Sequence, residues 1–152
     1  MRDHVIFDPT TETRPLAEQF QIDRQRYLDQ IRYVFEHSAF YRAKFQQAGF
    51  RSADDLGGLD DIAQLPFTEK DELRESQALH PPFGNHIAAS PDDLRRVFST
   101  SGTTGTPCYL GLTQHDLDMY ATNVARGYSA AGFKPGQRLV VGFNAGPFVA
   151  GA

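Results

Sequence analysis

A run of glycines and hydroxyl-bearing residues at 101–106 is the part of the chain whose residue types and spacing best suit chemistry. This glycine loop consists of Ser101, Gly102, Thr103, Thr104, Gly105 and Thr106. The two glycines let the backbone approach an anion closely and take positive φ, and the hydroxyls donate hydrogen bonds without adding charge. This combination is typical of a loop that grips phosphate. Its small side chains suit a nucleoside triphosphate.

The spacing of the glycine loop differs from that of a Walker A loop. Only two residues separate Gly102 from Gly105, no lysine follows, and Pro107 stands where that motif would open a helix. Residues 108–110, Cys-Tyr-Leu, favour a strand. We therefore predict a strand, an exposed and mobile loop, and a second strand over residues 95–113. A hairpin turn that binds no ligand is the alternative.

Four segments of the chain resemble, in the same order, segments of one enzyme family. They are residues 38–50, which begin Ser-Ala-Phe-Tyr-Arg and end Ala-Gly-Phe, residues 65–74, Leu-Pro-Phe-Thr-Glu-Lys-Asp-Glu-Leu-Arg, the glycine loop, and residues 130–137, Ala-Ala-Gly-Phe-Lys-Pro-Gly-Gln. Together they resemble the phenylacetate–coenzyme A ligase branch of the adenylate-forming superfamily. The resemblance covers the chain from about residue 33 onward. Complete ligases of this kind are several times longer, so we expect an N-terminal portion.

The resemblance implies that an aromatic carboxylic acid, similar to phenylacetate, is activated in two steps. The acid attacks the α-phosphate of ATP to give an acyl-adenylate and pyrophosphate, and the thiol of coenzyme A then displaces AMP. It also implies that the glycine loop holds the β- and γ-phosphates, with Mg²⁺ bridging phosphate oxygens. The family often has lysine where Thr106 stands, so this chain has one cation fewer at that position.

The resemblance further implies an acyl pocket that follows residues 139–143. It puts Phe148 against the aromatic ring of the substrate and counts Ala145 and Gly146 among the substrate-binding residues, with Ala145 where the branch often has a bulkier tyrosine. Phe148 as a plain helix-packing residue is the alternative. The catalytic residues, among them a lysine of a mobile C-terminal domain, are expected beyond Ala152. The fragment alone is therefore expected to be inactive.

The elements that must position these residues follow from hydrophobic periodicity and from the glycines and prolines. We predict helices at 16–37, at 40–48, after a cap at Thr68 and at 114–131, helical turns at 60–65 and 91–94, a linker at 79–91, and strands at 95–100, 108–113 and 138–143. The fold class is α/β and incomplete. A helical N-terminal region, residues 1–90, precedes the first strands of the large N-terminal domain of an adenylate-forming enzyme, residues 91–152.

Three other groups of residues are given structural roles. Thr113 is a suitable N-cap, so the acidic and imidazole groups after it are interpreted as a helix start and no metal site is expected; they are His115, Asp116 and Asp118. Loop and helix-end histidines are expected at the surface or in caps; they are His37, His80 and His86. Aromatic residues at helical spacing are expected in the core; they are Phe40, Tyr41, Phe45 and Phe50.

Charge and composition limit the partners and the compartment. The 152 residues carry a net charge of −4 and have no basic patch for nucleic acid or an anionic membrane. The longest uncharged run, 139–152, is too short to span a bilayer. The single cysteine, Cys108, permits no internal disulfide, and the first residues do not read as a signal peptide, so the cytoplasm is expected. The expected partners are the carboxylate, ATP and coenzyme A, and a homodimer stays open.

Two functions from different classes stay open at this point. The first is an aryl-acid:coenzyme A ligase represented by its N-terminal part. The second is a non-catalytic fragment or degenerate module that retains the fold and acts by association. A phosphate-binding module of another nucleotide enzyme would require the matches at 65–74 and 130–136 to be coincidence.

Overall fold

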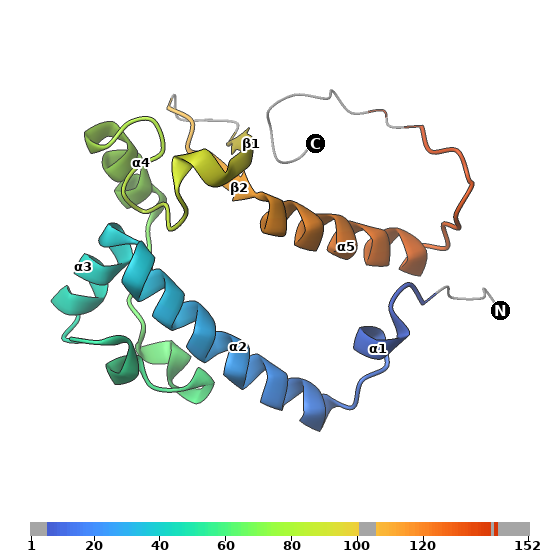
Figure 1. Cartoon of the computed structure of the whole chain (residues 1–152), viewed down its shortest axis with the longest axis horizontal. Coiled ribbons are helices and arrows are strands. Elements are labelled where there is room, and N and C mark those ends of the chain that lie inside the picture. The colour runs from blue at the N-terminus through green and yellow to red at the C-terminus, as the bar shows by residue number, and fades with distance from the viewer. Residues whose placement is uncertain (1–5, 101–105, 141, 143–152) are drawn as a thin grey trace.

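A computed structural model describes residues 6–100, 106–140 and 142 of the chain. The elements, in order, are α1 (Pro9–Glu12), α2 (Leu16–His37), α3 (Ala39–Gln47), the 3-10 helices η1 (Ala53–Leu56) and η2 (Leu59–Gln64), α4 (Lys70–Leu79), the 3-10 turn η3 (Pro91–Asp93), β1 (Leu94–Ser99), β2 (Tyr109–Thr113) and α5 (Gln114–Ala130). Figure 1 shows α2 and α5 along the two long sides, with α3, α4 and the strands gathered at one end and α1 near the far end of α5. This part of the chain is therefore mostly helical, with a two-stranded sheet.

The two helices predicted before residue 50 are confirmed, and a single serine joins them. Ser38 ends α2, because its N–H donates to the carbonyl of Val34 at 3.0 Å. The same residue starts α3, because its hydroxyl accepts a hydrogen bond from the N–H of Tyr41 at 3.3 Å. Ser38 is completely buried, so the corner between the helices is closed to water.

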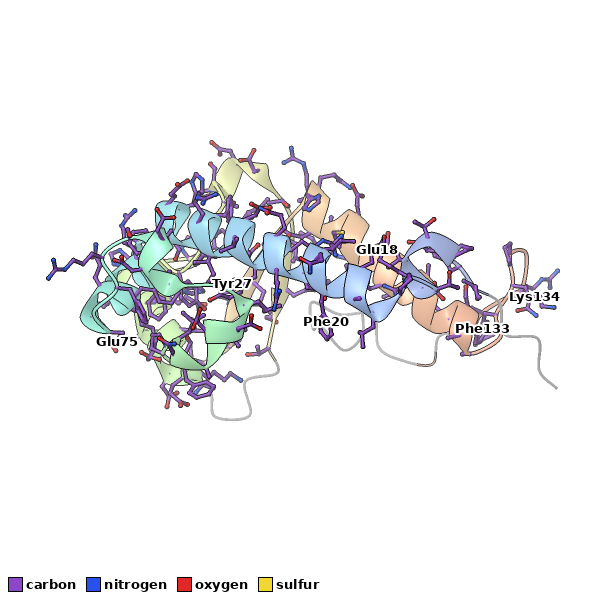
Figure 2. All side chains as sticks on the ribbon, turned by 90° about the horizontal axis from the view of Figure 1, so that it is seen from below. Glu18, Phe20, Tyr27, Glu75, Phe133 and Lys134 are labelled. Carbon is purple, nitrogen blue, oxygen red and sulfur yellow. The ribbon has the colours of Figure 1, made fainter. Side chains whose placement is uncertain are left out.

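The hydrophobic core lies between α2, α3 and η1. Its fully buried members are Ile31, Phe45 and Leu56, and the side chains packed around them are Tyr27, Val34, Phe35, Tyr41, Phe50 and Leu65. Three of the four aromatic residues predicted for the core are thus in it, whereas Phe40 makes an edge-on ring contact with His86 at 6.2 Å. Figure 2 shows Tyr27 partway along α2 and Phe20 nearer to the start of that helix. The hydroxyl of Tyr27 donates to the carbonyl of Leu56 at 3.3 Å, which ties α2 to η1.

The predicted hairpin and the helix after it are present. β1 and β2 pair antiparallel, with Ser99 opposite Tyr109. The next helix, α5, starts directly after β2 with the cap predicted at Thr113. The hydroxyl of Thr113 accepts from the N–H of Asp116 at 3.3 Å, and the carboxylate of Asp116 accepts the N–H of Thr113 at 2.8 Å. This reciprocal pair satisfies two backbone donors that a helix start leaves open.

The cap predicted at Thr68 is wrong, because α4 begins at Lys70 with Glu69 as its N-cap. The carboxylate of Glu72 accepts the N–H of Glu69 at 2.6 Å and also pairs with the ammonium of Lys44 on α3 at 2.5 Å. Hydrogen bonds from Lys44 and then from the N–H of Glu69 hold the pKa of Glu72 below its usual value. Glu72 is therefore the acidic residue of the capping box, and α4 begins one residue later than a cap at Thr68 would place it.

The strand predicted at 138–143 is not formed by residues 138–140 or by residue 142, which have no regular structure. Leu139 and Val140 are exposed. An apolar segment becomes a strand only where another strand offers hydrogen-bond partners, and the described sheet consists of β1 and β2. Among the described residues, no helix combines the length and the apolar character needed to cross a membrane.

The segment predicted as a linker after α4 is held by a buried polar cluster. The hydroxyl of Ser76 donates to Oδ1 of Asn85 at 2.7 Å and accepts the N–H of Asn85 at 3.1 Å, while Nδ1 of His86 lies 3.0 Å from the same hydroxyl. Because the single hydroxyl proton goes to Asn85, the imidazole must be the donor in its contact. Gly84 takes φ +81° there, and its missing Cβ leaves room for the imidazole ring. His86 is half-buried and its ring contacts Ser76, so the surface or capping role predicted for it holds only in part.

We expect Leu56→Ala to destabilise the protein by about 2–5 kcal/mol, because Leu56 is only 2% exposed and its removal leaves a cavity in a small core. Urea unfolding followed by circular dichroism measures the change. Ile62→Ala on the neighbouring η2 is the matched control, because Ile62 is 53% exposed and should cost less than about 1 kcal/mol. Equal losses for the two variants would contradict the assignment of the core.

A second prediction concerns pH. Burial lowers the pKa of His86 below the ordinary value of 6.5, because it disfavours the charged imidazolium. The unfolded chain then binds the proton more tightly than the folded one, so His86 contributes stability above its unfolded pKa that is lost as the pH falls through its folded pKa.

We expect the free energy of unfolding to fall as the pH is lowered from about 7.5 to about 5.5, and His86→Gln to reduce that slope. Urea unfolding at several pH values measures it. The control is His115→Gln, because His115 is exposed near the start of α5 and takes no part in the cluster. A slope unchanged by His86→Gln would show that this imidazole does not carry the pH dependence.

Candidate functional site

The glycine loop joins the two strands of the hairpin, as the sequence predicts. Residues 101–105 lie outside the described part of the chain, but both ends of the loop are defined. The N–H of Thr100 donates to the carbonyl of Cys108 at 2.9 Å, and the hydroxyl of Thr100 accepts the N–H of Cys108 at 3.0 Å. In a regular antiparallel pair, the carbonyl of Thr100 would accept the N–H of Cys108. Here the hydroxyl of Thr100 accepts it instead. The strand pairing extends to Thr100 and Cys108, and the loop between them spans residues 101–107.

At the exit of the loop, three successive residues become steadily less exposed. The side chain of Thr106 is exposed, Pro107 is half-buried, and Cys108 is buried, as predicted for a strand residue. Of the six loop residues assigned to phosphate, Thr106 is the one that the structure describes. An exposed hydroxyl beside a buried, hydrogen-bonded segment can reach a ligand without any rearrangement of the strand.

A glutamine that sequence reasoning missed holds the exit of the loop. Gln77 on α4 donates from Nε2 to the carbonyl of Pro107 at 3.1 Å and accepts at Oε1 the N–H of Tyr109 at 2.9 Å. The side chain of Gln77 is buried. No local signal marks it, because its partners lie about thirty residues further along the chain.

A pocket of about 540 Å³ opens beside the hairpin, on the side of α2. Its wall combines α2, the segment after α4, β2 and the start of α5, and it includes Gln30, Tyr33, Phe83, His86, Ile87, Tyr109, Leu110 and His115. The hydroxyl of Tyr33 donates to the carbonyl of Ala88 at 2.8 Å and so fixes one edge. The size and the mixed lining suit a small organic molecule. Thr106, the predicted site residue that the structure describes, is not among the residues that line this pocket.

The remaining predicted site residues are not placed by the structure. Ala145, Gly146 and Phe148, assigned to the acyl pocket, lie outside the described residues. Across residues 6–100, 106–140 and 142, no three His, Cys, Asp or Glu side chains gather in a way that could hold a metal ion. His115, Asp116 and Asp118 instead belong to the first turns of α5, where Asp116 completes the cap and Asp118 accepts a hydrogen bond from Gln114 at 2.9 Å.

No family profile matches the chain. Curated relatives do match it over most of its length, and several of them are named phenylacetate-coenzyme A ligase. The ligase of Thermus thermophilus is 36% identical over 149 residues, which is 97% of this chain and 32% of the relative. The Pseudomonas putida ligase is 33% identical over 150 residues, 98% of this chain and 32% of the relative. The Escherichia coli ligase is 34% identical over 140 residues, 92% and 31% respectively.

Solved structures of another coenzyme A ligase share the fold. A 2-hydroxyisobutyryl-CoA ligase in complex with 2-HIB-AMP and CoA, in the thioesterification state, superposes with a TM-score of 0.76 at 39% identity and covers 84% of this chain and 27% of that one. An open conformation of the same ligase, also with 2-HIB-AMP and CoA, gives a TM-score of 0.78 at 35% identity, with 90% of this chain and 31% of that one covered.

The chain thus spans about a third of the length of the curated relatives that it matches. Within that third the agreement is nearly continuous, since sequence identity above 30% accompanies a shared arrangement of the helices and the hairpin. Both findings lead to the group of enzymes that the four sequence segments resemble. Nearly the whole chain is thus similar to about a third of several phenylacetate–coenzyme A ligases, and it shares the fold of a solved coenzyme A ligase over that length.

Proposed function

We propose that the protein carrying this chain uses ATP to activate an aromatic carboxylic acid and transfers the acyl group to coenzyme A. The observation that carries the proposal is the match of nearly the whole chain to ligases named for phenylacetate. The solved neighbours support the same type of reaction, because they are complexes of a ligase with 2-HIB-AMP and CoA. The carboxylate, ATP and coenzyme A are thus the proposed partners.

The proposed reaction has two steps. A carboxylate oxygen of the acid attacks the α-phosphorus of ATP, the bond from that phosphorus to the bridging oxygen breaks, and pyrophosphate leaves. The thiol of coenzyme A then attacks the acyl carbon and AMP leaves. Both steps need negative charge to be stabilised and the reacting groups to be aligned, which is what a loop of backbone N–H groups and hydroxyls provides.

The glycine loop is the proposed phosphate site, with Ser101, Gly102, Thr103, Thr104, Gly105 and Thr106 as its members. The exposed hydroxyl of Thr106 and the buried, paired exit at Cys108 support this assignment. Mg²⁺, when bound with the nucleotide, would neutralise phosphate charge. It usually keeps several waters and few protein ligands, which agrees with the lack of an acidic cluster among the described residues.

The proposed acyl pocket uses Ala145, Gly146 and Phe148, with Phe148 against the aromatic ring. We also propose a division into a helical region, residues 1–90, and the start of the nucleotide-binding domain, residues 91–152. The bonds from Gln77 to Pro107 and Tyr109 cross this boundary, so the two parts form one packed unit at α4. The cytoplasm is the proposed location, in keeping with one buried and unpaired cysteine.

We expect the native protein to catalyse exchange of pyrophosphate into ATP only when a carboxylic acid is present, and to release AMP rather than ADP. The assay uses a panel of phenylacetate, benzoate-type and aliphatic acids, with product nucleotides separated by chromatography. Aromatic acids should give the fastest exchange. Release of ADP, or exchange that does not depend on the acid, would exclude the proposed reaction class.

The intact mass of the native protein should be measured first. A mass about three times 17.0 kDa would mean that the assay is made on a protein as long as the relatives. A native mass of 17.0 kDa would instead favour a module that acts by association. The same preparation, run on a sizing column, tests whether a homodimer forms.

Two variants should separate the roles of the loop threonines. Thr104→Val removes a hydroxyl at nearly constant volume and should weaken the adenylation step by about 1–3 kcal/mol, the cost of losing a hydrogen bond to a charged group. Thr106→Lys should add a cation near the triphosphate and lower the KM for ATP, more clearly at low salt. Steady-state kinetics with varied ATP measure both effects.

Unchanged kinetics for Thr104→Val would mean that the loop binds ATP only through its backbone. A higher KM for ATP in Thr106→Lys would mean that another residue already supplies the positive charge.

A further inference from the structure

The three residues that leave the glycine loop, 107–109, are hydrogen-bonded on both edges. In an extended chain, alternate residues direct their backbone groups to opposite sides. The N–H and carbonyl of Cys108 face Thr100 and continue the pairing with β1. The carbonyl of Pro107 and the N–H of Tyr109 face the other way, and both meet the side chain of Gln77.

The side chain of Gln77 hydrogen-bonds to the outer edge of β2 at this point, as a neighbouring strand would. Its primary amide offers one carbonyl and one N–H donor, the same pair of groups that a neighbouring peptide would present. It fits the spacing of the edge, with bonds of 3.1 Å to Pro107 and 2.9 Å to Tyr109. Without it, the carbonyl of Pro107 and the N–H of Tyr109 would lose these two part-buried hydrogen bonds on the outer edge of β2.

The helix that carries Gln77 is itself held firmly. The preceding residue, Ser76, makes the buried contacts with Asn85 and His86, and Glu72 on the same helix pairs with Lys44 of α3. Gln77 therefore connects the exit of the glycine loop to a helix that hydrogen bonds and an ion pair tie to α3 and to the segment after α4. The loop is fixed at its end by a helix that is distant in sequence.

We infer that Gln77 is a positioning residue for the ATP-dependent step. It does not touch the nucleotide. It fixes Pro107 and Tyr109, and thereby the place from which Thr106 and the rest of the glycine loop reach the triphosphate. This inference rests on the proposed function, because it assigns the loop to ATP, and it adds a residue that lies outside the loop.

The test compares Gln77→Met, which keeps the volume and removes both hydrogen bonds, with Gln46→Met as the matched control, because Gln46 is exposed on α3. The first readout is hydrogen–deuterium exchange of the native protein, resolved for the amide of Tyr109. Loss of its acceptor should speed that exchange by about tenfold in Gln77→Met and leave it unchanged in the control. The second readout is the KM for ATP in acid-dependent pyrophosphate exchange, which should rise by about fivefold to tenfold.

A second variant, Gln77→Glu, separates positioning from a general loss of structure. Its carboxylate can still accept the N–H of Tyr109 but has no proton for the carbonyl of Pro107. At pH 7.5 this carboxyl group is ionised, because an ordinary glutamate pKa is about 4.3. Gln77→Glu should therefore keep the slow exchange of the Tyr109 amide and still raise the KM for ATP, whereas Gln77→Met should change both.

The outcomes are distinguishable. A wild-type KM for ATP in Gln77→Met, together with faster exchange at Tyr109, would overturn the inference while the proposed function stands. Unchanged exchange at Tyr109 would show that the two hydrogen bonds do not hold the loop exit, and would overturn it as well. A wild type without acid-dependent exchange would refute the proposed function and the link from Gln77 to ATP with it. All variants are assayed well below their melting temperatures, so that a raised KM for ATP does not come from unfolded protein.

Discussion

The structure depends on the need to pair buried backbone groups in segments that are neither helix nor sheet interior. Two such segments meet α4, and adjacent residues of that helix serve them. Ser76 satisfies Asn85 in the segment after the helix, and Gln77 satisfies Pro107 and Tyr109 at the start of β2. A typical hydrogen bond contributes about 0.5–1.5 kcal/mol net, so each of these two polar side chains stabilises the contact between α4 and a neighbouring segment.

This constraint connects the helical region to the hairpin. Few apolar side chains are fully buried in the described residues, and the core of Ile31, Phe45 and Leu56 is built from α2, α3 and η1 without a residue of either strand. The hairpin is held by directional hydrogen bonds from α4 as well as by its own buried side chains, Phe98 and Cys108. Hydrogen bonds fix position more narrowly than apolar contact does, because they depend on distance and angle. The proposed role of the loop in binding a triphosphate would benefit from that narrower placement.

Local patterns predicted the elements, and contacts between distant segments decided what was missed. The periodicity of 16–37, the cap at Thr113 and the β-prone residues around the glycine loop act within a few residues, and each prediction from them is confirmed. The cap moved from Thr68 to Glu69 because Glu72 also meets Lys44 on another helix. Leu139 and Val140 are apolar enough for a strand, but residues 138–140 have no regular structure, because a strand forms only where another strand offers hydrogen-bond partners. The roles of His86 and Gln77 depend on partners that only the fold brings close. The assignments at 101–105 and 145–148 stay predictions.

The threonine at position 106 makes the placement of the loop more consequential. Where the family often has a lysine, a long flexible cation can find a phosphate from several loop positions, because its attraction falls slowly with distance. A hydroxyl acts only within hydrogen-bond distance of one oxygen. The exposed Thr106 directly precedes Pro107, whose carbonyl is bound by Gln77. In a chain with threonine at this position, the proposed phosphate contact would therefore depend on how Gln77 of α4 holds the loop exit.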